Sequence, residues 1–402
     1  MTIFIIANYS TVLGEKGSSR FTYLADLFAQ KGHQVTFITS SFSHRTKKNR
    51  DEAELNKLTN GKYKIKLINV PGYKKHLGLK RLLSIRRFGI NLRKELSSVK
   101  ELPDIVYFSF PTFSSARIAT KFALKNKIPP VIDIVDVWPE ALLSVLKIPT
   151  YLFNIIFLPY TIKANRIYKS ASAIIGVSET YVARARKVNN SGHYLSVFLG
   201  ADLKYFDNCL YSRIKQDGEI WLIYIGTISY SYDLITVLKA MNILIREQKL
   251  DYLKVKILGS GPHKDKLEQM ANSLELPVEF MGFLEYNEMI NYLKNSDIAL
   301  NAIVKGAQQS ITYKIGDYVS AGLPILNSSE NIEFRKMIVE EEIGINYNAG
   351  EERDLTEKIM RLLKNNEKML LYGKNSRRIA EHKFDRRKTY DEIIELVEKM
   401  IK

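Results

Sequence analysis

The chain has 402 residues, of which 46% are hydrophobic and 26% charged, a balance that excludes disordered, collagen-like and disulfide-stapled chains. At about 150 residues per domain, this length predicts two or three domains. Sixty lysines and arginines against 43 aspartates and glutamates leave a net charge of +17, so the expected partner is anionic: nucleic acid, an acidic membrane surface or a phosphorylated substrate.

The cysteine content and the first residues bear on the compartment. Cys209 is the only cysteine in the sequence, so an intrachain disulfide is impossible and a reducing cytoplasm fits best. The N-terminus, MTIFIIANYS, has no basic residue ahead of its apolar run, which predicts a buried strand and no signal peptide. The most apolar later stretch, 151–160, is too short to span a membrane, and Pro149 and Pro159 bracket it.

Short apolar runs alternate with amphipathic stretches of helix length in the first half of the chain. Between the first two runs, Phe21, Leu24, Ala25 and Phe28 recur at helical spacing, and Gly32 stands where that helix should end. Strands are expected at 3–7, 34–39, 65–70, 105–109, 131–135 and 173–177. This alternation predicts a parallel sheet covered by helices on both faces.

The same alternation restarts after an irregular polar stretch at 205–219. Strands are expected at 220–225, 253–258, 278–281 and 298–303, and helices at 234–248 and 286–295. We therefore expect an α/β protein with two Rossmann-like, doubly wound domains, at 1–205 and 213–385. A final helix at 386–402 is expected to cross back to the first domain. Ligands of such sheets bind at the carboxyl ends of the strands, so the active site is expected in a cleft between the domains.

Glycines follow several of the expected strands. Gly17 lies after the first strand, Gly226 and Thr227 after the strand at 220–225, and Gly259 after the strand at 253–258. Glycine lets backbone amides approach a phosphate at a helix start, which would suit a nucleotide or a sugar phosphate. The same glycines could also serve only to permit tight turns, and the sequence leaves both interpretations open.

The segment SITYKIGDYVSAGLP at 310–324 is more informative. Ser310 is a plausible N-cap, so the amides of Ile311 and Thr312 would point out of the helix start, where Lys314 could reach a bound diphosphate. Asp317 lies three residues further on the same face and could accept hydrogen bonds from a ribose diol. The alternative is a weak surface ion pair on a capped helix.

With this segment in view, the chain resembles the retaining glycosyltransferases of family 4, which have the GT-B fold, almost from end to end. The resemblance is carried, in order, by GSSRFTYLADLFAQKGHQVTFITS, DIVDVWPE, ASAIIGVSE, VFLGADLKYFD, IYIGTIS, VKILGSGP, VEFMGFL and SITYKIGDYVSAGLPIL. DVWPE and the last block look most like the subgroup that transfers sugars, often N-acetylated, onto polyprenyl-diphosphate-linked acceptors in bacterial polysaccharide synthesis.

The resemblance also implies roles for residues of the second domain. The family's pair of glutamates falls on Gln309 and Asp317, so Gln309 would contact the donor sugar without a charge and Asp317 would keep the ribose-binding carboxylate. The basic residues that the family uses after Gly226 are absent, which moves the charge of the leaving diphosphate onto Lys314. Phe283 and Leu284 correspond to positions beside the nucleotide base.

On the acceptor side, Asp136, Trp138 and Glu140 follow the strand at 131–135. Trp138 offers a flat face for a sugar ring, and Asp136 or Glu140 could bind or deprotonate the acceptor hydroxyl. Without the resemblance, this stretch would be an ordinary helix start with a proline in its first turn. The family needs no metal bound by a DxD motif, and DIVD has the wrong spacing for one; no cofactor is expected.

The positive charge is concentrated between residues 74 and 94, where eight basic residues and no acidic one alternate with leucines and other apolar side chains. A basic amphipathic helix suits an anionic membrane surface, although it could also pack on its own domain, and Gly89 argues against one long helix. The residues expected to contact the membrane are Lys80, Arg81, Arg86, Arg87, Arg93 and Lys94. The apolar stretch at 141–160 is a possible second membrane element or part of the core.

Together these patterns predict a metal-independent retaining glycosyltransferase in the cytoplasm, peripheral on the inner face of the plasma membrane. Its expected donor is a UDP-sugar, and its expected acceptor is a polyprenyl-diphosphate-linked saccharide of capsule, O-antigen or exopolysaccharide synthesis. One alternative is a non-hydrolysing nucleotide-sugar 2-epimerase of the same fold. The other is a basic nucleic-acid-binding protein, although the sequence contains no recognised nucleic-acid-reading module, so nucleic acid is not an expected partner.

Overall fold

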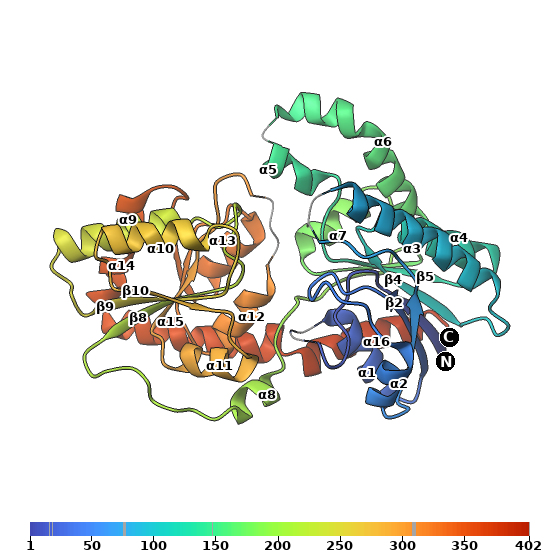
Figure 1. Ribbon diagram of the computed structural model, residues 1–402, viewed down its shortest axis with the longest axis horizontal. Coiled ribbons are helices and arrows are strands. Elements are labelled where there is room, and N and C mark those ends of the chain that lie inside the picture. Colours follow the sequence, from blue (N-terminus) through green and yellow to red (C-terminus); the bar gives the residue numbers. More distant parts are fainter. Residues whose placement is uncertain (16, 18, 75–77, 147, 308–310, 402) are drawn as a thin grey trace. The chain divides into compact units, whose positions relative to one another are not determined.

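The structure is a computed structural model that describes residues 1–15, 17, 19–74, 78–146, 148–307 and 311–401. The chain forms one compact unit from Met1–Val197 together with Tyr390–Lys402, and a second from Phe198–Thr389. Each unit is a parallel sheet with helices on both faces (Figure 1). This is the α/β class that the alternation of apolar runs predicted.

The sheet of the first unit has the strand order β3-β2-β1-β4-β5-β6-β7, and its neighbouring strands are parallel. The strands are β1 (Thr2–Ile6), β2 (Gln34–Ser40), β3 (Lys64–Ile68), β4 (Ile105–Phe110), β5 (Pro130–Ile134), β6 (Ala173–Gly176) and β7 (Tyr194–Ser196). Every residue of β4, β5 and β6 is buried, as expected for strands covered on both faces.

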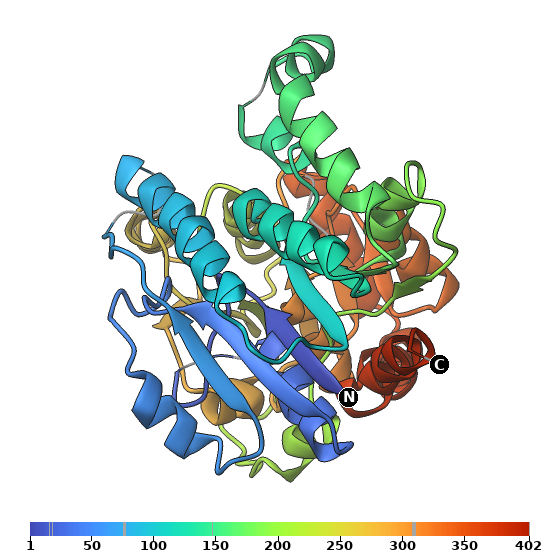
Figure 2. The ribbon, with the colours of Figure 1, turned by 90° about the vertical axis from the view of Figure 1, so that its right-hand side faces the viewer.

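Helices cover both faces of this sheet. They are α1 (Arg20–Gln30), α2 (Glu52–Leu58), α3 (Leu79–Ser97), α4 (Phe113–Lys125), the 3₁₀ turn η1 (Glu140–Leu142), α5 (Leu143–Leu146), α6 (Thr150–Lys169), α7 (Glu179–Arg186) and, from the end of the chain, α16 (Arg386–Lys399). α4 packs between α3 and α6, and Figure 2 shows these three helices, in light blue, teal and green, on one side of the sheet.

A buried ion pair joins α1 to the sheet of the first unit, and α16 packs against the same pair. Arg20 Nε of α1 donates to Asp133 Oδ2 of β5 at 2.7 Å, and both side chains are fully buried. The hydroxyl of Tyr107 donates to the same oxygen at 2.5 Å, and the Arg20 guanidinium lies 4.8 Å from the centre of the Tyr390 ring in α16. The last helix is therefore held by the polar centre of this unit as well as by apolar contacts of Ile393 and its neighbours.

The sheet of the second unit has the order β10-β9-β8-β11-β12-β13, again parallel. Its strands are β8 (Ile220–Ile225), β9 (Leu253–Leu258), β10 (Val278–Gly282), β11 (Ile298–Asn301), β12 (Ile325–Asn327) and β13 (Gly344–Asn346). Its helices are α8 (Leu203–Asn208), α9 (Leu234–Arg246), α10 (Lys264–Ser273), α11 (Tyr286–Lys294), α12 (Tyr313–Ser320), α13 (Ile332–Glu340), α14 (Glu352–Leu363), α15 (Asn366–Ile379) and the π turn η2 (Ala380–Phe384).

Alternate side chains of this sheet enter different apolar clusters. Leu222 and Tyr224 of β8 pack with α9, α10 and α14, whereas Ile223 and Ile225 pack with α11, α12 and α13. This alternation along β8 fixes which helices flank its carboxyl end, because successive side chains of a strand point to opposite faces. Tyr224 and the start of α12 therefore lie at the carboxyl edge of the sheet, beside the loops that contain Gly226 and Gly259.

Two helices are longer than the sequence indicates. α3 runs through Gly89, and a Cβ there would lie 3.0 Å from Cβ of Ser114, so the glycine lets α3 approach α4 closely and does not end the helix. α6 runs through Pro159, which was expected to bound the apolar stretch; a proline removes one helical hydrogen bond, and the flanking turns carry the helix on. The sequence analysis also missed β7, β12 and β13, which are only three residues long.

Candidate active site

The glycines after β8 and β9 build the strand ends by letting two backbones meet. Gly226 has φ +128° and Gly259 has φ +139°, and a Cβ on Gly259 would lie 1.9 Å from the Gly226 carbonyl oxygen. The amide of Ile228 donates to the Ser260 carbonyl at 3.0 Å. These contacts give a packing reason for glycine at position 259, and phosphate binding at these glycines stays a prediction.

Helix α12, which lies within the SITYKIGDYVS segment, begins later than the sequence predicted. Thr312 is the N-cap of α12, and its side chain makes no capping hydrogen bond. The prediction that Ser310 caps this helix is wrong, because Thr312 has extended backbone angles and the helix begins at Tyr313. Ile311 is 1% exposed and belongs to the core, so it anchors the loop ahead of the helix. Gln309 and Ser310 lie outside the described residues.

Lys314, at the start of α12, points into the edge formed by the β8 loop. Its ammonium nitrogen lies 3.8 Å from the centre of the Tyr232 ring and 4.5 Å from that of Tyr224. A Cβ added to Gly226 would be 3.9 Å from the same nitrogen. Lys314 is 6% exposed, and its nitrogen has no hydrogen-bond partner among the described residues.

Burial has a marked effect on this lysine. Because the ammonium form is desolvated and no carboxylate offsets the loss, the pKa of Lys314 is well below its ordinary value. A buried cation needs a partner, and the faces of Tyr224 and Tyr232 supply only partial compensation. An anion brought next to Lys314 would raise its pKa again.

Asp317 lies one turn further along α12 and has a different environment. The hydroxyl of Tyr286, at the start of α11, donates to Asp317 Oδ1 at 2.7 Å, and the Tyr286 ring stacks on that of Tyr205. Burial raises the pKa of Asp317 to about 6, against the lowering effects of the Tyr286 hydrogen bond and the charge of Arg386. One carboxylate oxygen is oriented by Tyr286, which leaves Oδ2 for another donor.

Sequence reasoning missed the tyrosines that surround these two residues. Tyr224 and Tyr232 flank Gly226 in the sequence, and Tyr286 follows Phe283 by three positions. The only available signal was the tyrosine content of the segment 224–232, which stands where the family pattern has basic residues. The sequence could not predict that Tyr224 and Tyr232 contact Lys314, because these residues lie on helices and loops that are distant in the sequence.

The remaining donor-side candidates lie on the same strand ends. The Thr227 carbonyl accepts a hydrogen bond from the Tyr224 hydroxyl at 2.7 Å, so Thr227 holds that ring in place through its backbone. Phe283 is 50% exposed, and Leu284 packs against the core cluster beneath α11 and α12. Phe283 therefore presents an aromatic surface to a ligand, whereas Leu284 supports the loop.

In the first unit, Asp136 follows β5 and collects several donors. Its carboxylate accepts from the Val137 amide at 2.9 Å, from Trp138 Nε1 at 3.2 Å and from the Tyr181 hydroxyl at 3.3 Å. Burial nevertheless dominates and raises the pKa of Asp136 to about 6. The indole of Trp138 is partly buried and oriented by Asp136, so the two residues act as one element.

Glu140 is bound by a cation. Arg184 of α7 donates to Glu140 Oε1, and the same guanidinium donates to Asn165 at 2.9 Å. This ion pair engages Oε1 of Glu140, whereas the donors to the Asp136 carboxylate described above are uncharged groups. The roles of Asp136 and Glu140 toward an acceptor stay predictions.

Gly17, a predicted phosphate contact, lies against the side chain of Arg45. A Cβ on Gly17 would be 1.8 Å from Arg45 Nη1, and its φ of +93° is in the region that favours glycine. Any larger residue would displace the Arg45 guanidinium. Gly17 thus makes room for Arg45 at the carboxyl ends of β1 and β2.

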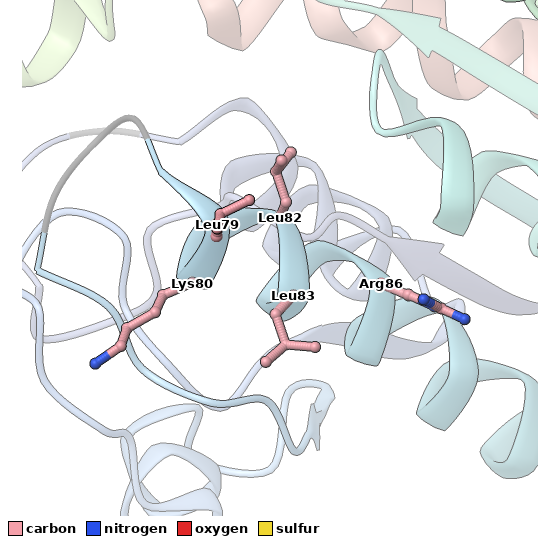
Figure 3. Close-up of a pocket in the computed structure, with 5 residues that line it drawn as sticks. All are labelled: Leu79, Lys80, Leu82, Leu83 and Arg86. Carbon is pink, nitrogen blue, oxygen red and sulfur yellow. The ribbon is translucent and has the colours of Figure 1, made fainter.

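The cations expected at a membrane lie along α3. Lys80, Arg86, Arg87, Arg93 and Lys94 are exposed, whereas Arg81 is partly buried and lies over the Tyr9 ring at 5.3 Å. The first two turns of α3 also border an open surface hollow of 410 Å³, which is lined by Leu79, Lys80, Leu82, Leu83 and Arg86 (Figure 3). Among the described residues, no helix is long and apolar enough to cross a membrane.

Within the described ranges, no three His, Cys, Asp or Glu side chains come together in a way that could hold a metal ion. Histidines instead take part in local contacts, such as the hydrogen bond between His33 Nε2 and Glu398 at 2.9 Å. The groups available at the strand ends are thus cations, carboxylates and aromatic rings.

Two parallel Rossmann-like units, the second with a buried cation at its glycine-rich strand ends, define the GT-B class of folds. Residues 212–379 match the family model "Glycosyl transferases group 1". The sequence has no significant match among curated proteins.

Solved structures cover nearly the whole chain. HepE from Anabaena, solved in complex with UDP, is 14% identical, covers 99% of this chain and 100% of its own, and has a TM-score of 0.71. The sucrose-phosphate synthase from Thermosynechococcus elongatus is 12% identical, with coverages of 100% and 99% and a TM-score of 0.75. WaaG, a glycosyltransferase involved in lipopolysaccharide biosynthesis, is 16% identical, covers 95% of each chain and has a TM-score of 0.65. At these identities the likeness establishes the fold.

Proposed function

We propose that this protein is a retaining glycosyltransferase that moves a sugar, an N-acetylated hexose in our expectation, from a UDP-sugar to a lipid-diphosphate-linked saccharide in the synthesis of a capsule, O-antigen or exopolysaccharide. The observation that carries the proposal is the buried Lys314 ammonium, unpaired among the described residues and directed at the Gly226 loop. The family match of residues 212–379 supports the reaction class. The UDP bound to HepE supports the choice of donor.

In the proposed reaction, the bond between the sugar C1 and the diphosphate oxygen breaks, and UDP leaves with the electron pair. The acceptor hydroxyl oxygen bonds to C1 and gives up its proton to Asp136. Lys314 would neutralise the charge that develops on the leaving diphosphate. A charge fixed in a desolvated site stabilises such a transition state strongly, because it needs no reorganisation during the reaction. The rings of Tyr224 and Tyr232 would hold the ammonium group in place without competing for its protons.

Asp317 would hold the ribose of the donor. Tyr286 occupies Oδ1, so a ribose hydroxyl would donate to Oδ2. This contact requires the ionised carboxylate, which the pKa of about 6 permits at neutral pH. Phe283 would lie beside the base, and Gln309 and Ser310 remain predicted contacts of the donor sugar and phosphates.

The first unit would bind the acceptor through Asp136 and Trp138. With a pKa of about 6, Asp136 is mostly ionised at pH 7.5 yet basic enough to accept a proton from a sugar hydroxyl. The indole of Trp138 would stack on the acceptor sugar. Glu140 would act through Arg184, shaping the site and leaving the proton transfer to Asp136. No step in this scheme requires a metal ion.

We propose in addition that the protein works peripherally on the inner face of the plasma membrane. The exposed cations of α3 would contact anionic headgroups, each contributing about 1 kcal/mol. The first half of α6 supplies an apolar counterpart, since Tyr151 is 71% exposed, Ile155 69% and Leu158 53%, and no charged residue occurs in 150–162. A helix that is apolar all round and yet exposed suits an interface with lipid.

The direct test is transfer from radiolabelled UDP-sugars to a polyprenyl-diphosphate saccharide in the presence of EDTA. We expect product in the chelator and a loss of at least tenfold in kcat for Lys314→Met. A chemically matched control is Lys305→Met, which removes an equal charge from an exposed part of the same unit. Complete loss of transfer in EDTA, or an unchanged kcat for Lys314→Met, contradicts the proposal. Conversion of the UDP-sugar without an acceptor would favour the epimerase.

A further inference from the structure

A compact aromatic cluster lies at the carboxyl ends of β1, β2 and β3 in the first unit. The Tyr9 and His44 rings are 5.1 Å apart, and those of His44 and Tyr73 are 5.6 Å apart. His44 Nδ1 and the Tyr73 hydroxyl share a hydrogen bond of 2.5 Å. The three residues come from loops after three neighbouring strands, so their meeting point is an edge where ligands of parallel sheets bind.

Two cations lie on this cluster. The Lys47 ammonium is 4.8 Å from the centre of the Tyr73 ring, and the Arg81 guanidinium is 5.3 Å from that of Tyr9. Lys47 Nζ is buried and has no hydrogen-bond partner among the described residues. Burial, and after it the positive charge of Arg81, lowers the pKa of Lys47.

The nearby sequence offers little negative charge to balance these cations. The segments 41–50 and 71–94, which contribute Lys47 and Arg81, contain no acidic residue. Glu15, in the loop after β1, is engaged by Arg50, whose Nε and Nη2 donate to its two carboxylate oxygens at 2.8 and 2.7 Å. The cluster therefore has an excess of positive charge at a strand-end edge, which would attract an anion with more than one negative charge.

An apolar surface begins directly beside this charge. Arg81 is in the first turn of α3 and turns toward Tyr9, whereas its neighbours Leu79, Leu82 and Leu83 are 83%, 62% and 49% exposed. These leucines line the open hollow of 410 Å³ together with Lys80 and Arg86 (Figure 3). A single helical turn thus carries a cation on one side and exposed leucines on the other, an arrangement that matches an amphiphile with a charged head.

We propose that Lys47 and Arg81 bind the diphosphate of the lipid-linked acceptor and that the first part of its lipid chain lies over Leu79, Leu82 and Leu83. This inference rests on the proposed function for the identity of the acceptor, but it assigns a separate site in the first unit. Arg81, which the sequence placed among the membrane contacts, then recognises one lipid in particular, and the exposed cations of α3 remain for the bilayer.

Binding of the lipid diphosphate alone tests the site, without any sugar transfer. Farnesyl diphosphate is a soluble probe, and equilibrium dialysis in the presence of saturating UDP keeps it from the diphosphate position at Lys314. We expect Lys47→Met and Arg81→Met each to weaken binding of farnesyl diphosphate about tenfold or more, as loss of a charge-assisted contact does. Lys121→Met, an equal charge change on the exposed face of α4, should leave it within about twofold.

Two further experiments test the site. One separates binding of the diphosphate group from binding of the lipid chain, and the other separates binding of a lipid diphosphate from binding of ordinary phospholipid. Leu79→Ser with Leu82→Ser should weaken farnesyl diphosphate binding several-fold and leave inorganic pyrophosphate binding unchanged. Lys47→Met should leave binding to phosphatidylglycerol vesicles unchanged. Unchanged farnesyl diphosphate binding in both cation variants overturns the proposal. So does a loss of vesicle binding in Lys47→Met without a loss for farnesyl diphosphate, because that result assigns the cations to bilayer headgroups.

These results do not depend on the reaction. A protein that fails to bind UDP or to transfer sugar, yet loses farnesyl diphosphate binding in Lys47→Met, would refute the proposed function and keep this site. Intact transfer with unchanged farnesyl diphosphate binding in the cation variants would refute this site and keep the proposed function.

Discussion

The ammonium nitrogen of Lys314 lies 3.8 Å from the centre of the Tyr232 ring, inside the second unit and beside the loop after β8. An aromatic face stabilises an ammonium ion but offers it no proton acceptor. The relationship therefore keeps a lysine buried at a glycine-rich strand end without satisfying its hydrogen bonds. This state is suited to the arrival of an anionic ligand, and it leads to the first prediction.

Donor binding should be accompanied by uptake of a proton. The pKa of Lys314 is well below its ordinary value in the free protein, and a bound diphosphate would raise it, so UDP affinity should fall as the pH rises. Calorimetry of UDP binding at pH 8 in buffers of different ionisation enthalpy should show net uptake of protons by the protein. In Lys314→Met the uptake should approach zero, and an equal uptake in that variant would contradict the assignment.

The aromatic face of Tyr232 should matter more than its hydroxyl. Tyr232→Leu removes the ring that faces the ammonium and should weaken UDP binding by about three- to thirtyfold, as the loss of a desolvated cation–π contact of 0.5–2 kcal/mol predicts. Tyr232→Phe keeps the ring and should bind UDP nearly as the parent does. Tyr230→Leu, at a position 78% exposed, is the matched control. Equal affinities for the Leu and Phe variants at 232 would exclude the role of the ring.

Protonation of Asp317 should set the acid limit of donor binding. Its pKa of about 6 means that the carboxylate proposed to bind the ribose is protonated as the pH falls through 6. The hydrogen bond from Tyr286 lowers this pKa, so Tyr286→Phe should move the acid limit to higher pH while leaving affinity at pH 8 within a few-fold. The measurement is UDP affinity between pH 5 and 8. An acid limit that does not move in Tyr286→Phe would show that another group controls it.

Asp136 should lower the stability of the first unit at neutral pH. Its folded pKa of about 6 lies above the value of 3.8 for an unperturbed aspartate, so the fold favours the protonated form and the stability contributed by this group rises as the pH falls from above 6 toward 4. Asp136→Asn should therefore stabilise the unit at pH 7.5 by up to about 3 kcal/mol. Urea unfolding at pH 7.5 and near pH 4 checks this, since the gain should vanish at the lower pH.

The buried pair of Arg20 and Asp133 should be essential for the first unit and for docking of α16. Arg20→Met leaves the fully buried Asp133 without its cation and should cost about 3–5 kcal/mol of unfolding free energy. Because the Arg20 guanidinium also lies over Tyr390, the same variant should speed proteolysis within α16. Lys31→Met breaks an exposed pair with Asp391 and should change stability by less than about 1 kcal/mol. Similar losses for the two variants would refute this ranking.

The order of elements was largely readable from the sequence. The predicted strands at 220–225 and 253–258 coincide with β8 and β9, because buried parallel strands leave continuous apolar runs and the helices between them show helical periodicity. The strands of three residues escaped detection, since so short a run carries no periodicity. Gly89 and Pro159 were expected to interrupt or bound helices, yet α3 and α6 run through them. Packing of α3 against α4 and the helical turns on either side of Pro159 outweigh the low helix propensity of one residue.

The sequence by itself determined the α/β class, the repeated Rossmann-like pattern and the presence of Lys314 and Asp317 on one helix, since each follows from local periodicity or spacing. Only the tertiary structure decided that Lys314 is buried against the Tyr232 ring and that the Tyr286 hydroxyl donates to Asp317. It also decided that Arg81 lies over the Tyr9 ring, away from the other cations of α3. These contacts join segments distant in the chain, and burial, which sets the charge state of each group, is a property of the packed structure.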